Sequence, residues 1–218
     1  MEPRFSLGLN KKDIEVLQQI HNYFGVGKIY KQGSNAVQYS VRSIQELLVI
    51  IEHFDKYSLI TQKQADYLLW RQVILMITRK EHLTPEGLKT ILNIRASLNR
   101  GLSDKLKSAF LDVVPVQRPL VAYQKIFDPN WLSGFISAEG CFLVIIKKCK
   151  TTSLGFQVFL RFQLTQHSRD EQLLKSLIEY LGCGRVISSS GWVDFRVEKL
   201  FDLTDKVIPF LVKYPIVG

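Results

Sequence analysis

The sequence has few of the features that mark secreted, disulfide-linked or membrane-spanning proteins. It contains three cysteines in 218 residues, and none of them forms a CxxC pair. An odd number without that spacing argues against a disulfide framework or a zinc site. No apolar run reaches the roughly 18 residues that a membrane helix needs. The first residues, MEPRFSLGLNKKD, resemble neither a signal peptide nor a transit helix, so we expect a soluble protein with reduced thiols and no membrane partner.

Acidic residues are also scarce. Twenty Asp and Glu stand against 29 Lys and Arg, which gives a formal net charge of +9. A surplus of this size favours polyanions, either nucleic acid or an anionic surface. A basic protein without such a partner remains an alternative on charge alone. The hydrophobic content of 46% is that of an ordinary globular chain with one large or two small domains.

What the sequence does contain is an internal repeat. RFSLGLNKKDIEVLQQIHNYFGVGKI, from Arg4, aligns with RFQLTQHSRDEQLLKSLIEYLGCGRV, from Arg161, and Arg, Phe, Leu, Asp, Tyr and Gly recur at a constant offset. The register slips by one residue where VQYSV meets VDFRV. It recovers where KYSLI, from Lys56, meets KYPIV, from Lys213. Agreement over this length predicts two copies of one folded unit.

Each copy predicts the same order of elements: a strand, an amphipathic helix, a two-stranded hairpin and a second helix. These elements fall at 5–9, 13–24, 28–31 with 37–42, and from 44 in the first copy; in the second copy they fall at 155–165, 170–181, 185–188 with 193–198, and from 200. Further helices are predicted at 61–83, 84–101 and 102–110. The predicted organisation is a first repeat at 1–110, a proline-containing linker at 111–130 and a second repeat at 131–218.

The symmetry of the repeat also predicts segments that this sequence does not contain. In the second copy, WLSGFISAEGCFLVIIKKCK precedes the strand with Arg161, and its equivalent in the first copy would lie before Met1. The first copy continues into three more helices, whereas the second stops at Gly218. We therefore expect two incomplete units, the first without its initial helix and strand and the second without its C-terminal helices.

The segment WLSGFISAEGCFLV, from Trp131, predicts a helix with one face of small residues. Asp128 followed by Pro129 is typical of a helix start. Gly134 and Ala138 are four residues apart and therefore lie on the same side of the helix. Small residues at these positions allow a second helix to approach closely.

An acid stands at the end of this predicted helix. Glu139 falls in the last turn, and Gly140 leads into a predicted strand at 141–147. If a partner helix carried a second acid, the two carboxylates would bind a divalent metal and activate water for phosphodiester hydrolysis. Glu139 is thus the candidate catalytic and metal-binding residue, with Gly140 beside it in the metal site.

LSGFISAEG and its flanks TQHSRDEQLL, YLGCG, HFDKYSLITQK, KEHLTPEGL and LNRGLSDKL resemble the LAGLIDADG homing endonucleases. The resemblance is closest to single-chain, two-repeat members encoded in fungal mitochondrial introns. It implies an α+β fold of two pseudo-symmetric αββαββα units, whose saddle-shaped antiparallel sheets lie in the DNA major groove. It also implies a monomeric, site-specific double-strand DNA endonuclease of mitochondrial origin, with Mg²⁺ held by one acid from each motif.

Two alternatives remain from the sequence. Some members of the family are maturases, so the chain could be a maturase or structured-RNA-binding protein without cleavage, with intron RNA as its partner. It could also be a DNA-binding remnant that has lost catalysis. The chain has a single motif acid, so we expect residues 1–218 alone not to cut both strands of DNA.

Strand alternation predicts which side chains face nucleic acid. On the strand at 155–165, one face is apolar and carries Phe156, Val158, Leu160, Phe162 and Leu164. The opposite face carries Gln157, Phe159, Arg161, Gln163 and Thr165. The matching positions in the hairpin of the second copy are Arg185, Ile187, Ser189, Trp192, Asp194, Arg196 and Glu198. In the first copy they are Arg4, Ser6 and Gly8 on the first strand and Lys28, Tyr30, Gln32, Gln38, Ser40 and Arg42 in the hairpin.

Basic residues near these strands are candidates for phosphate neutralisation and catalysis. Lys147 is the main phosphate-binding candidate, together with Lys148 and Lys150. Relatives often place a lysine on the strand after GCG, where this sequence has Ile187. Lys199, just beyond the hairpin, is the basic residue that we expect near the active site.

Overall fold

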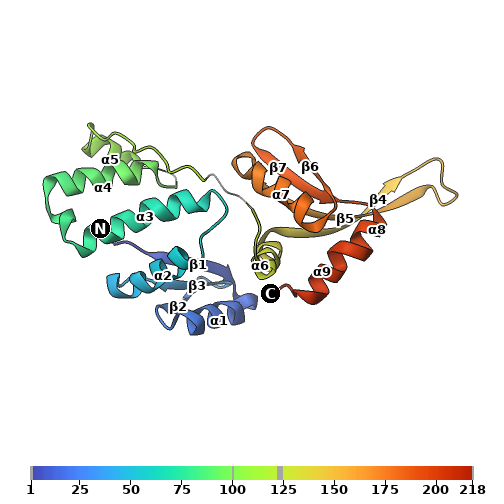
Figure 1. The fold of residues 1–218 in the computed structure, drawn as a ribbon, viewed down its shortest axis with the longest axis horizontal. Coiled ribbons are helices and arrows are strands. Elements are labelled where there is room, and N and C mark those ends of the chain that lie inside the picture. The colour runs from blue at the N-terminus through green and yellow to red at the C-terminus, as the bar shows by residue number, and fades with distance from the viewer. Residues whose placement is uncertain (1, 100, 122–124, 218) are drawn as a thin grey trace. The chain divides into compact units, whose positions relative to one another are not determined.

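The computed structural model describes residues 2–99, 101–121 and 125–217. The chain separates into two compact units, Met1–Val121 and Ala122–Gly218, called unit one and unit two below. Each unit combines one antiparallel sheet with helices (Figure 1). This architecture confirms the α+β class expected from the sequence.

Unit one opens with β1, α1, β2, β3 and α2, which span Phe5–Asn10, Ile14–Phe24, Lys28–Gln32, Ala36–Val41 and Ile44–Lys56. A 3-10 turn, Lys11–Asp13, leads from β1 into α1. The sheet order is β1-β3-β2, and β3 pairs antiparallel with both neighbours. Gly25 ends α1 in the left-handed conformation, with its N–H donating to the carbonyl of His21.

The first core of unit one lies between this sheet and the helices α1 and α2. Leu17, Tyr39 and Leu47 have no exposed surface there. The Tyr39 hydroxyl donates to the carbonyl oxygen of Val26 at 2.8 Å, which satisfies the polar end of this buried ring. Burial, with a smaller effect of Glu46, raises the pKa of Tyr39 to about 12.

Three more helices follow in unit one, namely α3, α4 and α5 at Lys63–Thr78, Pro85–Ser97 and Asp104–Ala109, with a 3-10 turn at Glu81–Leu83. Ile74 of α3 belongs to the first core. Trp70 contacts that core and also a second cluster, so α3 joins the two. The second cluster consists of Leu69, Val73, Met76, Ile91, Ile94 and Leu98.

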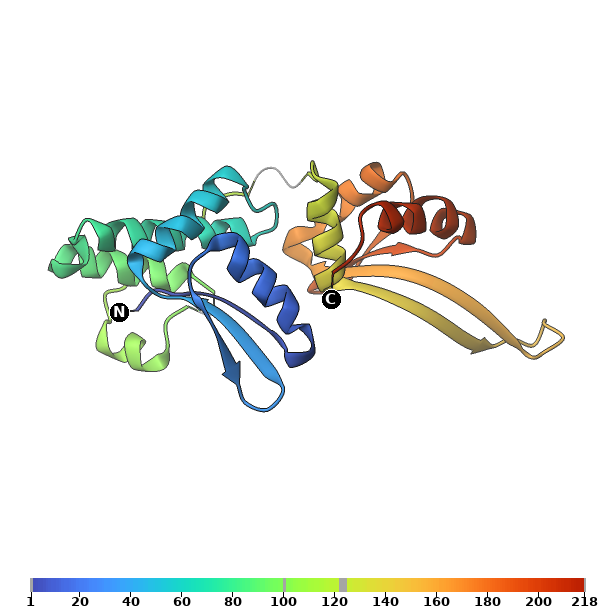
Figure 2. The ribbon, with the colours of Figure 1, turned by 90° about the horizontal axis from the view of Figure 1, so that it is seen from below.

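Unit two contains α6, β4, β5, α7, β6 and β7, which span Pro129–Glu139, Gly140–Lys148, Phe156–His167, Glu171–Leu181, Arg185–Ser188 and Trp192–Val197. It ends with α8 at Leu200–Asp202, a π-helical turn at Leu203–Val207 and α9 at Ile208–Lys213. A 3-10 turn at Ser168–Asp170 precedes α7. The sheet order is β4-β5-β7-β6, and the long β4–β5 hairpin projects beyond the other strands (Figure 2).

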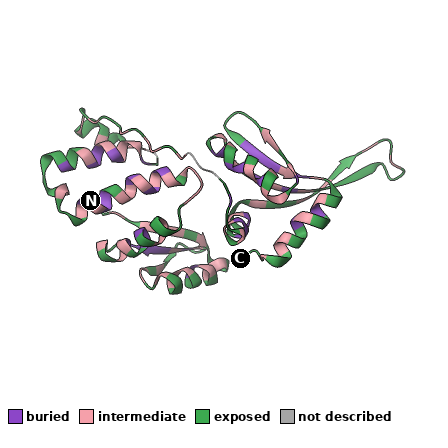
Figure 3. Cartoon of the chain, viewed as in Figure 1, coloured by how far each residue is buried: buried purple, intermediate pink, exposed green. Residues whose placement is uncertain are grey.

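The core of unit two is built around two aromatic rings. Phe162 of β5 and Phe195 of β7 meet edge to face, with ring centroids 6.4 Å apart. Leu132 of α6, Leu164 of β5 and Leu174 of α7 are also fully buried. Buried residues gather on β7 and α6, whereas the outer part of the β4–β5 hairpin is exposed (Figure 3).

A repeated glycine explains one of the strongest sequence matches between the copies. Gly27 has φ 81° and Gly184 has φ 86°, a region that residues with a side chain rarely adopt. A Cβ on Gly27 would lie 2.9 Å from the Tyr39 ring, and one on Gly184 would lie 2.5 Å from the Phe195 ring. Both positions therefore need glycine for the backbone conformation and for the close approach to a buried ring.

The elements predicted from the repeat occur in the predicted order in both units. α6 begins at Pro129, within the segment assigned to a linker, because the Asp128 side chain caps it by accepting the N–H of Asn130 at 2.7 Å. Unit two has a four-stranded sheet, while the described part of unit one has three strands and no counterpart of β4. No helix in the described ranges is both long and apolar enough to cross a membrane.

Candidate functional site

The helix α6 presents its small residues on an open face. Leu132 and Ile136 are buried, with 0% and 2% of their surface exposed, and they anchor the helix in unit two. Gly134 and Ala138 are exposed, and a Cβ built on Gly134 would meet nothing within 4 Å. The motif therefore folds into a helix with one anchored side and one side of small residues that can receive another helix.

Two serines of the motif fix α6 to the end of the chain. The Ser133 hydroxyl donates to the carbonyl of Pro215 at 2.7 Å. The Ser137 hydroxyl donates to the carbonyl of Val217 at 2.7 Å and accepts that residue's N–H at 2.7 Å. These serines are not among the site residues predicted from the sequence. Their spacing of one helical turn was the only available signal, since their partners lie some 80 residues away.

Glu139 is the last residue of α6, and it is exposed. The negative end of the helix dipole lies at this C-terminus and adds to the charge of the carboxylate. The last turn holds no basic residue that would offset it. A Cβ on Gly140 would lie 2.4 Å from the carbonyl oxygen of Ile136, so only glycine allows the chain to turn here from α6 into β4.

The oxygen atoms at the end of α6 suit a hard divalent cation. Such cations prefer carboxylate and carbonyl oxygens, and an exposed carboxylate at the negative end of a helix fits that preference in type and charge. Within residues 2–99, 101–121 and 125–217, no group of three or more His, Cys, Asp or Glu could hold a metal ion. Glu139 offers a single carboxylate, which is one possible ligand and not a whole ligand set.

The strand register brings the predicted nucleic-acid residues of unit two onto one side of its sheet. Gln163 lies opposite Arg196, and Thr165 lies opposite Asp194. Arg185 of β6 lies opposite Arg196 from the other side. We call this side, with Arg161 and Glu198 in the next row, the polar face of unit two.

One cluster on the polar face is built around Glu198. Its carboxylate accepts from Nε of Arg161 at 2.8 Å and from Nη2 of Arg185 at 2.5 Å. Burial by itself raises the pKa of Glu198, but the hydrogen bonds and charges of the two arginines outweigh it and leave the pKa below its ordinary value. Glu198 therefore stays ionised at neutral pH and orients both guanidinium groups.

A second cluster is built around Asp194, which is buried although it lies on the polar face. Its Oδ1 accepts from the Thr165 hydroxyl at 2.6 Å and from the Gln163 amide at 3.3 Å. Its Oδ2 accepts from Nη2 of Arg196 at 2.6 Å. Trp192, at the start of β7, remains half exposed.

The corresponding side of unit one has a different chemistry. The register places Ser6 and Lys28 on either side of Ser40, and Gly8 and Tyr30 on either side of Gln38. Arg42 lies over the Tyr30 ring at 5.7 Å from its centroid, and it also pairs with Glu2 at 3.7 Å. Arg4 and Lys28 are exposed, whereas Ser40 is buried.

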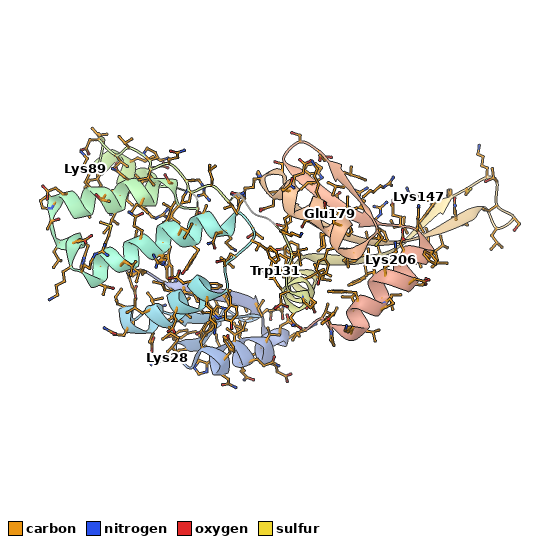
Figure 4. The ribbon with its side chains drawn as sticks, in the orientation of Figure 1. Lys28, Lys89, Trp131, Lys147, Glu179 and Lys206 are labelled. Carbon is orange, nitrogen blue, oxygen red and sulfur yellow. The ribbon has the colours of Figure 1, made fainter. Side chains whose placement is uncertain are left out.

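The outer half of the β4–β5 hairpin is exposed on both sides. Lys147, opposite Gln157, lies with its ammonium 5.7 Å from the centroid of the Phe159 ring (Figure 4). On the other side, burial stops at Phe162, because the helices cover only the part of β5 that pairs with β7. The apolar residues that remain exposed are Phe142, Val144, Ile146, Phe156, Val158 and Leu160.

Lys199 stands at the N-cap of α8, just after β7, and is exposed. Gly140, next to Glu139, pairs with Leu164, while Val197 pairs with Phe162. β4 and β7 both run antiparallel to β5, so Glu139, which precedes Gly140, lies toward Thr165, whereas Lys199, which follows Val197, lies toward Leu160. The register therefore does not bring Lys199 beside Glu139. Ile187 lies opposite Asp194. It stands on the strand after GCG, where a lysine was expected from the resemblance.

Taken together, the fold and the site define a class of protein. Two units share one plan of strand, helix, hairpin and helix, and one of them adds a helix that ends in an exposed acid at the edge of its sheet. That combination is the architecture that the resemblance to two-repeat homing endonucleases implies.

Comparison with known proteins agrees with this class. The sequence profile described as LAGLIDADG endonuclease matches residues 1–74 and 132–218. The chain is 40% identical over 220 residues to "Probable intron-encoded endonuclease 3" of Neurospora crassa, covering 99% of this chain and 41% of that protein. It is 37% identical to "Probable intron-encoded endonuclease 2" of the same organism, covering 100% of this chain and 50% of that protein.

Solved structures show the same likeness. The I-SmaMI LAGLIDADG homing endonuclease bound to cleaved DNA matches with a TM-score of 0.94 at 43% identity, over 99% of this chain and 73% of that one. I-CpaMI bound to uncleaved DNA matches with a TM-score of 0.96 at 41% identity, over 100% of this chain and 76% of that one. I-SmaMI has also been solved on an uncleaved DNA target in the presence of calcium ions.

The chain belongs to the LAGLIDADG endonuclease family. It spans half or less of the length of the two Neurospora relatives. Other relatives are named for introns, among them ND4 intron 1 of Podospora anserina and a cox1 intron of Schizosaccharomyces pombe.

Proposed function

We propose that the chain forms part of an intron-encoded, site-specific endonuclease that cuts both strands of duplex DNA. The observation that carries this proposal is α6, whose open small face ends in the exposed acid Glu139 beside a polar sheet face. Membership of the family and the DNA-bound structures of relatives support it. The intron names of the relatives support an organelle-encoded origin, in mitochondria.

Glu139 is proposed as one of two acids that hold Mg²⁺, with the Gly140 backbone beside it. The second acid comes from a helix that packs on the open face at Gly134 and Ala138. A divalent cation in such a site supplies Lewis-acid polarisation of the phosphate and activation of water. The part of this chain is to hold the cation at the edge of the unit-two sheet.

We propose that the two polar sheet faces lie in the major groove, where base edges carry a donor and acceptor code. The complete protein, with its repeats at 1–110 and 131–218 joined by 111–130, would then bind as a monomer with pseudo-twofold symmetry. Phosphate contacts give register, and base contacts give specificity. The proposed contact residues are Arg4, Ser6, Lys28, Tyr30, Gln38, Ser40 and Arg42 in unit one and Lys147, Gln157, Phe159, Arg161, Gln163, Thr165, Arg185, Trp192 and Arg196 in unit two, while Asp194 on the same face holds Arg196.

Duplex binding and its salt dependence test this function. Purified residues 1–218 should select a preferred duplex from a randomised pool, because the polar faces offer base-edge donors. Affinity for that duplex should fall by about 100-fold or more between about 50 and about 200 mM salt, since phosphate contacts release counterions. Fluorescence anisotropy measures both effects. A flat salt titration, or tighter binding to a structured RNA competitor than to the selected duplex, would contradict the proposal.

A further inference from the structure

Asp194 occupies an unusual place for an acid. It lies in the middle of β7 on the polar face, yet only 3% of the residue is exposed. Three polar side chains of the face donate to its carboxylate, namely Gln163, Thr165 and Arg196. An acid that is buried and saturated in this way has little capacity left to contact a base or to repel a phosphate.

The three donors are themselves candidates for reading bases. Arg196 is held through one Nη2–H, and its buried Nε has no hydrogen-bond partner in the part of the chain that the structure describes. A buried donor without an acceptor is costly, by about 1–3 kcal/mol. The cluster therefore holds a guanidinium in one orientation while leaving donors of that group unused.

Guanine is the base that this arrangement suits. Its major-groove edge carries two acceptors, N7 and O6, and arginine is the side chain that most often pairs with both. A guanidinium held in place beforehand loses less side-chain entropy on binding than a free one. Gln163 and Thr165, fixed by the same carboxylate, would lie over the neighbouring position.

The internal repeat shows that this cluster is not a requirement of the fold. With VQYSV aligned to VDFRV, Gln38 of unit one stands for Asp194 and Ser40 stands for Arg196. Unit one builds the same hairpin around a buried Tyr39, with neither acid nor arginine at these two places. The cluster is thus a feature of unit two alone, as expected if the two units read different sequences.

Building on the proposed DNA-binding function, we propose that Asp194 is a positioning residue that fixes Arg196 for recognition of a guanine in the half of the target read by unit two. Asp194 itself does not touch the DNA. Its role is specificity, carried through Arg196, rather than affinity for the phosphate backbone.

Base preference measured position by position tests this role. Residues 1–218 are first used to select a duplex from a randomised pool, and affinities are then measured for all base pairs at each position. Arg196→Ala should remove the preference for guanine at one position, by about 10-fold or more. Asp194→Asn should flatten the preference at the same position, while binding to unselected duplex and the salt dependence stay within about 2-fold of the wild type. The matched control is Glu179→Gln on α7 (Figure 4), which likewise removes one negative charge, here from an exposed side chain. It should change neither the base preference nor the salt dependence.

A double replacement separates positioning from a general structural effect. Adding Asp194→Asn to Arg196→Ala should cause no further loss of preference, because the two residues act through one contact. Thermal melting is recorded for each variant. If Asp194→Asn fails to fold, Asp194→Glu takes its place, because it keeps the charge but shifts the carboxylate that holds Arg196 and should weaken the same guanine preference.

The outcomes distinguish this inference from the proposed function. If the wild type selects a duplex but Arg196→Ala changes no guanine preference, the inference is wrong and the proposed function stands. The inference would also be wrong if Asp194→Asn weakened binding to every duplex equally. The same holds if the double variant lost more guanine preference than Arg196→Ala alone. If the wild type selects no preferred duplex at all, both the inference and the proposed function are wrong.

Discussion

Replacing Glu139 with Gln should abolish double-strand cleavage in a protein that carries two motif helices. The described part of this chain supplies one acid-bearing motif helix, so we expect purified residues 1–218 alone not to cut both strands. A second motif can be supplied from the same sequence by fusing a copy of residues 128–150 ahead of residue 2. The internal repeat predicts the equivalent segment at that position. With Mg²⁺ and the selected duplex, this fusion should cleave.

Glu139→Gln in the fusion should lower the rate by about 1,000-fold or more, since the substitution removes a carboxylate that holds the cation while keeping the size of the side chain. Glu179→Gln is the matched control and should cleave at the rate of the parent fusion. Linearisation of a plasmid that carries the selected duplex measures the rate. Double-strand cutting by residues 1–218 alone, lost on Glu139→Gln, would show that one motif per chain is sufficient.

Phe195→Ala should cost about 3–5 kcal/mol of unfolding free energy in unit two, because the ring is fully buried and its removal leaves a cavity. The ring packs on Phe162 and against Gly184, and no part of it is exposed. Trp192→Ala on the same strand is the control. Its side chain is 51% exposed, so stability should change far less.

Chemical denaturation followed by circular dichroism measures both variants. Unit one has its own core around Tyr39 and Leu47 and should keep its transition in Phe195→Ala. Equal destabilisation by the two substitutions would mean that the unit-two core does not depend on the Phe162–Phe195 pair.

Much of the fold could be predicted from the sequence because local patterns repeat. The recurrence of GVGK and GCGR marked hairpins whose second glycine must adopt a positive φ against a buried ring. Alternation in β5 separated its two faces correctly, as the pairing of Gln163 with Arg196 and of Phe162 with Val197 confirms. These signals depend on neighbouring residues, so one sequence is sufficient to find them.

The features that escaped prediction depend on residues far apart in the chain. Ser133 and Ser137 bond to the segment at Pro215 and Val217, which no pattern within the motif indicates. Asp194 is on the predicted face but is buried by side chains from β5 and from its own strand. Alternation also could not show where burial ends along β5, because that depends on how far the helices of unit two reach.

The central claim is that Glu139 binds the divalent metal, and metal binding by the chain on its selected duplex tests it most directly. Isothermal titration of residues 1–218 with Ca²⁺ or Mg²⁺ should show weak binding, because Glu139 is the only acid that this motif supplies to the site. Glu139→Gln should remove that binding, and Glu179→Gln should leave it unchanged. Metal affinity that is the same in wild type and Glu139→Gln would contradict the account, since Glu139 would then lie outside the metal site.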